Sequence, residues 1–196
     1  LDAFRAKGCP VIGVVVNRAE PERVEEIQAR LKIELVDDDL GYTVIPADSV
    51  LSSPTVKEIA DYLDASVLYG HDHLDRLARR YMVIAMQMQN YLPRLQEGAL
   101  LIVPSDRGSV ILSALQAHRS INYPYLAGVL LTAGEILPPA VSLLLDGLPS
   151  ALPIIAVKSD TYDTVTNVNA VRSYITSDNP RKIKASLELF KKYVDI

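Results

Sequence analysis

Residues 98–118, GALLIVPSDRGSVILSALQAH, decide the fold, because they set an apolar run directly before a polar break and a helical pattern. Residues 99–103 have the length and the Val, Leu and Ile content of a strand covered on both faces, as in parallel sheets. Similar runs occur at 11–16, 128–131 and 154–157, and helical patterns lie at 22–31, 56–63, 110–118, 140–145 and 180–194. This alternation predicts an α/β fold with a parallel or mostly parallel sheet and flanking helices.

Composition limits the classes of partner. The 196 residues are 49% hydrophobic, which is ample for a packed core, and they carry a formal net charge of -4. This charge gives no general attraction to nucleic acid or to anionic lipid, so we expect neither as a partner. No apolar run reaches the roughly 18 residues of a membrane span, and the single cysteine, Cys9, cannot form an internal disulfide. A soluble cytoplasmic protein fits best, with Cys9 as an inert packed thiol.

The chain divides into two groups of elements. We place a boundary within the polar stretch YGHDHLDR, residues 69–76, which gives domains at 1–70 and 71–196. The opening LDAFRAKGCPVIGVVVNR is typical of a helix end, a stop at Gly8 and a strand, so the chain is expected to begin inside a larger fold. For the helix at 56–63, Ser53 is the expected N-terminal cap and Pro54 lies just inside the start.

Polar turns follow three of the predicted strands. They contain Ser105-Asp106-Arg107, Thr132-Ala133-Gly134 and Lys158-Ser159-Asp160-Thr161. Ligands of open parallel sheets bind at the carboxyl ends of the strands, so we expect these turns to share one edge.

Two interpretations of this edge stay open. The N–H groups of the following helix, together with Arg107, would attract an anion such as a nucleotide phosphate. In the structural alternative, Ser105 or Asp106 caps the helix and Arg107 forms an exposed ion pair worth under about 1 kcal/mol.

Other motifs point to no chemistry. His71-Asp72-His73 offers metal-binding side chains, but without a third ligand at a familiar spacing a solvated linker is favoured. Residues 36–41, VDDDLG, lack the spacing of a calcium loop and predict a polar turn. The G-x-G-x-x-G and G-x-x-x-x-G-K-[ST] phosphate loops are absent from the sequence. We therefore predict no catalytic residue and no metal site.

Residues 98–118 and 125–168 together resemble the DRTGG domain, over about residues 71–196. Asp106 and Arg107 match the Asp-Arg pair of the family, and Thr132 and Gly134 match the first and last positions of its Thr-Gly-Gly. Ala133 stands where the family usually has glycine, and alanine permits less backbone freedom than glycine in a turn. The resemblance implies a regulatory, dimer-forming module. The ligand-binding residues would come from the three turns: Ser105, Asp106, Arg107, Thr132, Gly134, Lys158, Asp160 and Thr161.

Two stretches of the first 70 residues carry a second resemblance. VIGVVVNR at 11–18 and GYTVIPADSVLSSPTVKEIADYL at 41–63 are similar to the closing part of the dethiobiotin-synthetase-like P-loop domain. That domain precedes the DRTGG domain in long phosphate acetyltransferases. The resemblance implies that the chain is a middle segment of such a protein, or of a shorter relative without the transferase domain.

The leading hypothesis is therefore a non-catalytic regulatory and oligomerisation module of a phosphate acetyltransferase-like protein. Its effector would be a nucleotide or an acetyl-CoA-related metabolite, and it would form a homodimer or a higher homo-oligomer. A purely structural dimerisation domain is the alternative. An enzyme in its own right, a transferase or an NTPase, is the third hypothesis, and we expect no turnover from it.

Overall fold

The computed structural model describes residues 1–36, 40–134, 136–148 and 152–194, which belong to two compact units. The first unit is Leu1–Ser52 with Ile175–Ile196, and the second is Ser53–Tyr174. By packing, the second unit thus begins before residue 71, because a helix and a strand that precede residue 70 belong to it. The division at residue 70 into domains of separate origin stays a prediction.

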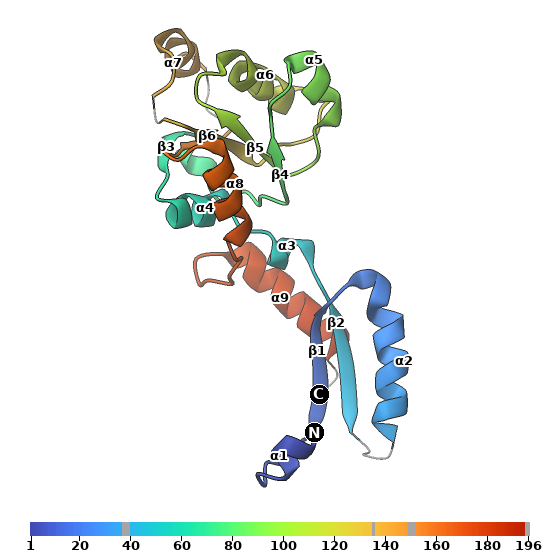
Figure 1. The fold of residues 1–196 in the computed structure, drawn as a ribbon. Coiled ribbons are helices and arrows are strands. Elements are labelled where there is room, and N and C mark those ends of the chain that lie inside the picture. The colour runs from blue at the N-terminus through green and yellow to red at the C-terminus, as the bar shows by residue number, and fades with distance from the viewer. Residues whose placement is uncertain (37–39, 135, 149–151, 195–196) are drawn as a thin grey trace. The chain divides into compact units, whose positions relative to one another are not determined.

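The second unit is built on a five-stranded sheet (Figure 1). Its order is β3-β7-β6-β5-β4, in which β4 to β7 are mutually parallel and β3 pairs antiparallel with β7. The strands are β3 (Ser66–Tyr69), β4 (Arg80–Val83), β5 (Ala99–Pro104), β6 (Gly128–Thr132) and β7 (Ile154–Ala156). This sheet confirms the prediction of a mostly parallel α/β fold.

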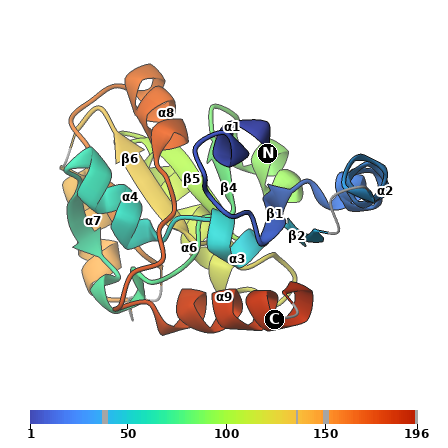
Figure 2. The ribbon, with the colours of Figure 1, turned by 90° about the horizontal axis from the view of Figure 1, so that it is seen from below.

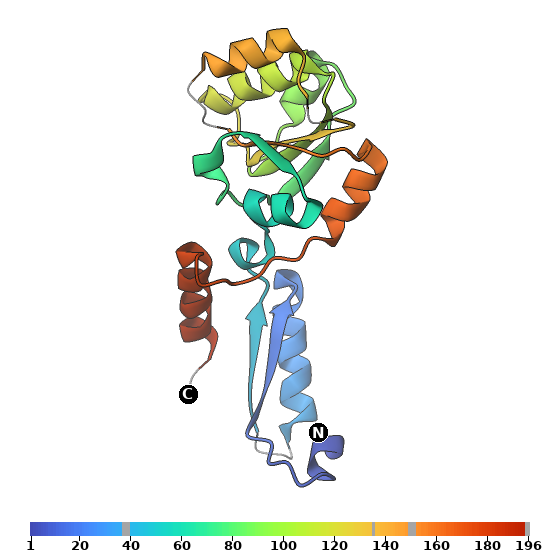
Figure 3. The same ribbon diagram turned by 90° about the vertical axis from the view of Figure 1, so that its left-hand side faces the viewer.

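Helices cover both faces of this sheet (Figure 3). Leu101 and Val103 of β5 pack in one core cluster with residues of α5, α6 and α7, while Leu100 and Ile102 pack in the other with residues of α4 and α8. These elements are α4 (Val56–Leu63), α5 (Met88–Tyr91) with η4 (Leu92–Arg94), α6 (Gly108–Arg119), α7 (Pro139–Asp146) and α8 (Thr161–Ala170). Because successive side chains of a strand point to opposite faces, an uninterrupted apolar run fills both clusters.

The start of α4 differs from the prediction, since Ser53 is not its cap. The N-cap is Thr55, whose Oγ1 accepts a hydrogen bond from the Glu58 N–H at 3.0 Å. The Glu58 carboxylate in turn accepts from the Thr55 N–H at 2.6 Å. This reciprocal capping box satisfies two N–H groups, which a cap at Ser53 could not have done. The predicted linker at 71–73 is also structured, as the short helix η3 (His71–His73) of the second unit.

The first unit contains a two-stranded parallel sheet, β1 (Gly13–Ala19) beside β2 (Gly41–Pro46). Helices α2 (Val24–Glu34) and α9 (Pro180–Tyr193) contact β2 and flank the pair (Figure 2). Its short helices are α1 (Asp2–Arg5), η1 (Pro21–Arg23) and α3 (Ser49–Ser52).

Two expectations for the first unit are wrong. β1 was expected to be buried on both faces, but the Val15 side chain is 58% exposed and Ile12 just before the strand is 94% exposed. Cys9 is exposed rather than packed. The side chains of β1 and Cys9 could pack in a core, but few described residues of the first unit cover them. Among the described residues, no helix is long and apolar enough to cross a membrane.

Candidate functional site

The three polar turns lie together, because they follow strands that are neighbours in the sheet. Pro104 at the end of β5 is in register with Thr132 at the end of β6, and the Ser105 N–H donates to the Thr132 carbonyl at 3.0 Å. On the other side, the Ala133 N–H donates to the Ser159 carbonyl at 2.8 Å. We call residues 105–107, 132–134 and 158–161 the rim. Backbone hydrogen bonds thus join all three turns at one edge of the sheet.

Two pairs of predicted site residues meet across the rim. The buried Thr132 hydroxyl is hydrogen-bonded to the Thr161 hydroxyl, with 2.8 Å between the oxygens. Gly134 lies against Ser105, since a Cβ added to that glycine would stand 3.3 Å from the Ser105 Oγ. These contacts bring hydroxyl groups from all three strand ends close together, with the Thr132 hydroxyl buried.

Asp160 has a structural role at the rim. It is the N-cap of α8, and its Oδ1 accepts a hydrogen bond from the Asp163 N–H at 2.9 Å. The neighbouring Ser159 hydroxyl is paired with the Thr164 hydroxyl, with 2.9 Å between the oxygens. A carboxylate at a helix N-terminus is favourable in itself, so Asp160 needs no ligand to explain its presence.

Asp106 and Arg107 do not behave as the structural alternative predicted. The N-cap of α6 is Arg107, and no side chain caps this helix, so neither Ser105 nor Asp106 has the expected capping role. Asp106 and Arg107 are both exposed. Within the described residues, neither side chain has a hydrogen bond or an ion-pair partner. Arg107 is therefore an exposed residue at the N-terminus of α6 whose guanidinium has no ion-pair partner among the described residues. Lys158 adds a second exposed cation to the rim.

Ala133 adopts a backbone conformation that glycine adopts more easily than alanine. Its φ is 60°, in the left-handed region, and the following Gly134 has φ 149°. A left-handed conformation costs an alanine roughly 1–2 kcal/mol. The turn is therefore formed in spite of the methyl group, and the strain is carried by Ala133.

A further polar cluster lies in the second unit and was not found from the sequence. The His118 Nδ1 accepts from the Leu126 N–H at 3.2 Å, and its Nε2 lies 3.1 Å from Nη1 of Arg76. The Arg76 guanidinium also lies 4.5 Å from the ring centroid of Tyr125. Burial, then the charges of Arg76 and His73, lower the pKa of His118 to about 4. Arg76 and His118 are 42 residues apart, so no sequence spacing signals this contact.

The metal interpretation of His71 and His73 gains no support from the surrounding side chains. In the described ranges, no three His, Cys, Asp or Glu side chains gather as a metal site would require. The stretch 36–41 falls partly outside the described residues, because 37–39 are not among them.

Two proteins of similar sequence are named phosphate acetyltransferase. The one from Synechocystis sp. is 38% identical over 196 residues, and the one from Nitratidesulfovibrio vulgaris is 39% identical over 202 residues. Both alignments cover 100% of this chain, but the chain spans only 28% of the length of each relative.

A solved structure gives a weaker likeness. It contains the CBS and DRTGG domains of the regulatory region of Clostridium perfringens pyrophosphatase, complexed with the activator diadenosine tetraphosphate. Its TM-score is 0.48 at 12% identity, with 93% of this chain and 88% of that one covered. A likeness at this level decides nothing about this chain.

The family itself is shown by sequence. The DRTGG domain matches residues 58–171, which is more than half of the 196 residues. The match contains all three turns of the rim, and it begins within α4 and ends just after α8. The chain therefore belongs to the DRTGG domain family.

Proposed function

We propose that the chain is a non-catalytic regulatory and oligomerisation module of a phosphate acetyltransferase-like protein that acts in the cytoplasm on acetyl-CoA and acetyl phosphate. Two relatives with this name align with the whole chain while extending well beyond it, which supports a role as one part of a larger protein. Membership of the DRTGG family supports the regulatory part of the proposal.

The rim is the proposed effector site, and Arg107 is the observation that carries it. Its guanidinium is exposed and without a partner among the described residues, at the point where α6 begins. A helix N-terminus and an arginine both favour an anion, and arginine binds phosphate through two parallel hydrogen bonds. A nucleotide and an acetyl-CoA-related metabolite share this phosphate chemistry. Ser105, Gly134, Lys158 and Thr161 would line the rest of the site, and the buried Thr132 would hold Thr161 from beneath through their hydroxyl contact.

Calorimetry tests the effector site. ATP, acetyl-CoA, NADH and pyruvate are titrated into the wild-type chain and into Arg107→Ala. We expect binding of at least one phosphate-containing compound, weakened by about 10-fold or more in Arg107→Ala because a charge-assisted contact is lost. Arg80→Ala is the matched control, since Arg80 is also exposed but begins β4, at the opposite end of the strands from the rim. Absence of heat with all four compounds, or an equal loss in both variants, would reject the effector role.

A purely structural dimerisation domain is the second candidate. It is favoured by the contacts that already occupy Asp160 and Thr132 within the chain. Light scattering of Arg107→Ala separates the two candidates. Dissociation of the oligomer without any change in ligand binding would support the structural role.

We further propose that residues 1–70 are the C-terminal part of a dethiobiotin-synthetase-like P-loop domain. Support comes from the parallel pairing of β1 with β2 and from the exposed apolar side chains of β1. Parallel strands are normally covered on both faces, so β1 has the composition of an inner strand of a larger sheet.

A further inference from the structure

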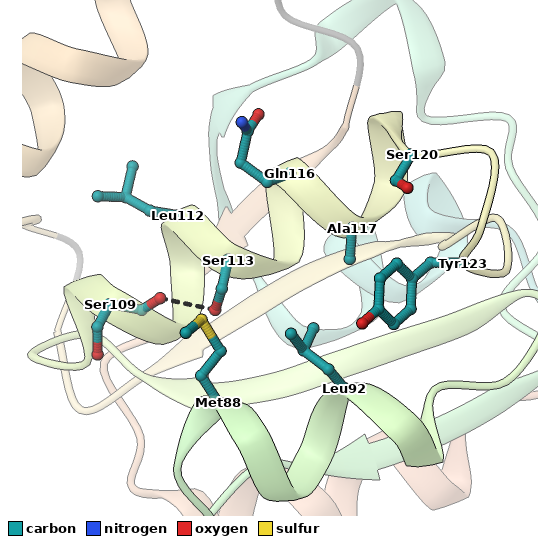
Figure 4. A pocket seen from close by; sticks show the side chains of 9 residues that line it. All are labelled: Met88, Leu92, Ser109, Leu112, Ser113, Gln116, Ala117, Ser120 and Tyr123. Carbon is teal, nitrogen blue, oxygen red and sulfur yellow. Dashed lines mark hydrogen bonds between the residues drawn. The ribbon is translucent and has the colours of Figure 1, made fainter.

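Helix α6 borders two features of the second unit that lie outside the rim. An open groove of about 460 Å³ lies between α6 and the pair α5 and η4 (Figure 4). The described residues that line this groove are Met, Leu, Ala, Ser, Gln and Tyr, so they offer no charge with which to select a ligand. At its C-terminal end, the same helix brings His118 against Arg76 and Tyr125. Of the two features, the second combines a cation with directed N–H groups.

The cluster of Arg76, His118 and Tyr125 lies at the opposite end of the strands from the rim. Arg76 is in the loop before β4, and Tyr125 is in the loop before β6. These loops lead into the amino-terminal ends of parallel strands, whereas the rim lies at the carboxyl ends. Arg76 and His118 are half-buried and Tyr125 is 46% exposed, so ions from solvent can reach the cluster.

The His118 ring faces two hydrogen-bond donors. Its Nδ1 lies 3.2 Å from the Leu126 nitrogen, and its Nε2 lies 3.1 Å from Nη1 of Arg76. At neutral pH the ring is uncharged, since burial, then the charges of Arg76 and His73, lower the pKa of His118 to about 4. A neutral imidazole accepts at one nitrogen and carries a proton on the other, whereas arginine only donates. The two contacts are therefore not both hydrogen bonds.

Burial of the backbone decides which nitrogen of His118 accepts. Leu126 is fully buried, and a buried backbone N–H that lacks an acceptor is costly. Nδ1 therefore accepts from the Leu126 N–H, and Nε2 carries the proton. The Nε2–H of His118 and the Nη1–H of Arg76 are then two donors that face each other without an acceptor between them.

Arg76 lacks a counter-charge in direct contact. Its Nε is buried and has no hydrogen-bond partner among the described residues, and no ion pair joins its guanidinium to a described carboxylate. Burial lowers the pKa of Arg76, while Tyr125 and the charge of Asp75 act in the opposite direction. The Glu97 carboxylate also reaches this edge, but it accepts from the Tyr125 N–H at 2.9 Å. A half-buried cation with an unpaired donor is unfavourable unless an acceptor joins it.

We propose that Arg76 and His118 together bind one oxyanion, a phosphate or a carboxylate group, at this end of the strands. An oxygen placed against Nη1 of Arg76 and Nε2 of His118 accepts from both, and its charge balances the guanidinium. The Leu126 N–H holds the ring in the tautomer that donates to the anion. This site goes beyond the proposed function, because it shares no residue with the rim.

Nuclear magnetic resonance of the wild-type chain at pH 7 tests the site. Inorganic phosphate, acetate and sodium chloride are added in separate titrations at equal ionic strength, and the signals of the His118 ring and the Leu126 amide are followed. We expect both signals to shift and to saturate with at least one oxyanion, and the one that saturates at lower concentration identifies the group that the site takes. An equal response to chloride, or no saturating response to either oxyanion, would overturn the proposal.

Two substitutions locate the binding. Arg76→Gln should raise the dissociation constant of the oxyanion by about 10-fold or more, because the cation is lost while an amide donor remains. Arg119→Gln is the matched control, since Arg119 is an exposed arginine directly after His118, and it should bind like the wild type. Equal weakening in both variants would mean that the anion responds only to net charge, which contradicts the proposal.

The pKa of His118 in the wild-type chain gives a second readout, which does not depend on whether Arg76→Gln folds. Saturating phosphate should raise this pKa by about 1 or more above its value in sodium chloride, because a bound anion favours the imidazolium. An unchanged pKa would reject the site. Arg107→Ala keeps this proposal apart from the effector site, because it should weaken binding at the rim and leave the response of His118 intact. Loss of that response in Arg107→Ala would place the anion at the rim instead.

Discussion

The two units contain strands of similar sequence in different surroundings. In the second unit, β5 carries Leu100 to Val103, all fully buried between two layers of helices. In the first unit, β1 carries Val14 to Val16, yet Val15 is largely exposed. An apolar run therefore shows what a strand is able to bury, while its neighbours decide whether the strand is buried. A strand in a five-stranded sheet has such neighbours, and one in the described two-stranded pair has few.

The same substitution in both strands gives the largest expected contrast. Val103→Ala should lower the free energy of unfolding of the second unit by about 2–3 kcal/mol, because two buried methyl groups are lost and a cavity remains. Val15→Ala should change the first unit by less than about 0.5 kcal/mol, as surface changes do. Hydrogen exchange reports each unit separately, through the amides of β5 and of β1. A cost above about 1 kcal/mol for Val15→Ala would show that this side chain is covered in solution.

Mild acid should act on the second unit through His118. The pKa of His118 in the folded chain is about 4, below its ordinary value of 6.5. Between these values the unfolded chain binds more protons than the folded one, so stability falls as the pH is lowered from about 6.5 to about 4. Partial solvent exposure of the ring limits the loss to about 1 kcal/mol between pH 7 and pH 5.

Exchange of the β5 amides at pH 7 and pH 5, corrected for the intrinsic rate, measures this loss. His118→Gln should remove the part that depends on this ring, and His71→Gln, at an exposed position of η3, should retain it. An unchanged pH dependence in His118→Gln would mean that other groups cause the acid effect. The β1 amides serve as the internal reference, since all three histidines lie in the second unit.

The fold of the second unit was predictable where the residues of one element are enough to identify it. This holds for the apolar runs of β5, β6 and β7 and for the helical periodicity of α6. Helix α8 carries no helical signal of its own, because its sequence TYDTVTNVNA is rich in residues of low helix propensity. Its buried contacts are Thr164 and Val168, and its start is fixed by the Asp160 cap. Strand β3 was missed because it has only four residues, all partly buried.

The rim was predictable in its location but not in its contacts. Neighbouring parallel strands end at one edge, and this rule brought Ser105, Thr132 and Thr161 together correctly. The rule says nothing about which of these side chains already form hydrogen bonds within the chain. Asp160 turned out to cap α8, and Asp106 does not cap α6. The contact between Arg76 and His118 was beyond sequence reasoning, since it joins the loop before β4 to the end of α6.

The smallest expected effect is a gain in the free energy of unfolding on substitution of Ala133, whereas the changes above lower that free energy. Ala133→Gly should stabilise the second unit by about 0.5 kcal/mol, because the relief of the left-handed strain slightly exceeds the entropy that glycine adds to the unfolded chain. Ala127→Gly is the control. Ala127 is buried and has no positive φ, so its loss should destabilise the unit by about 1 kcal/mol. Paired urea titrations measure both changes, and destabilisation by Ala133→Gly would show that the turn carries no strain at this residue.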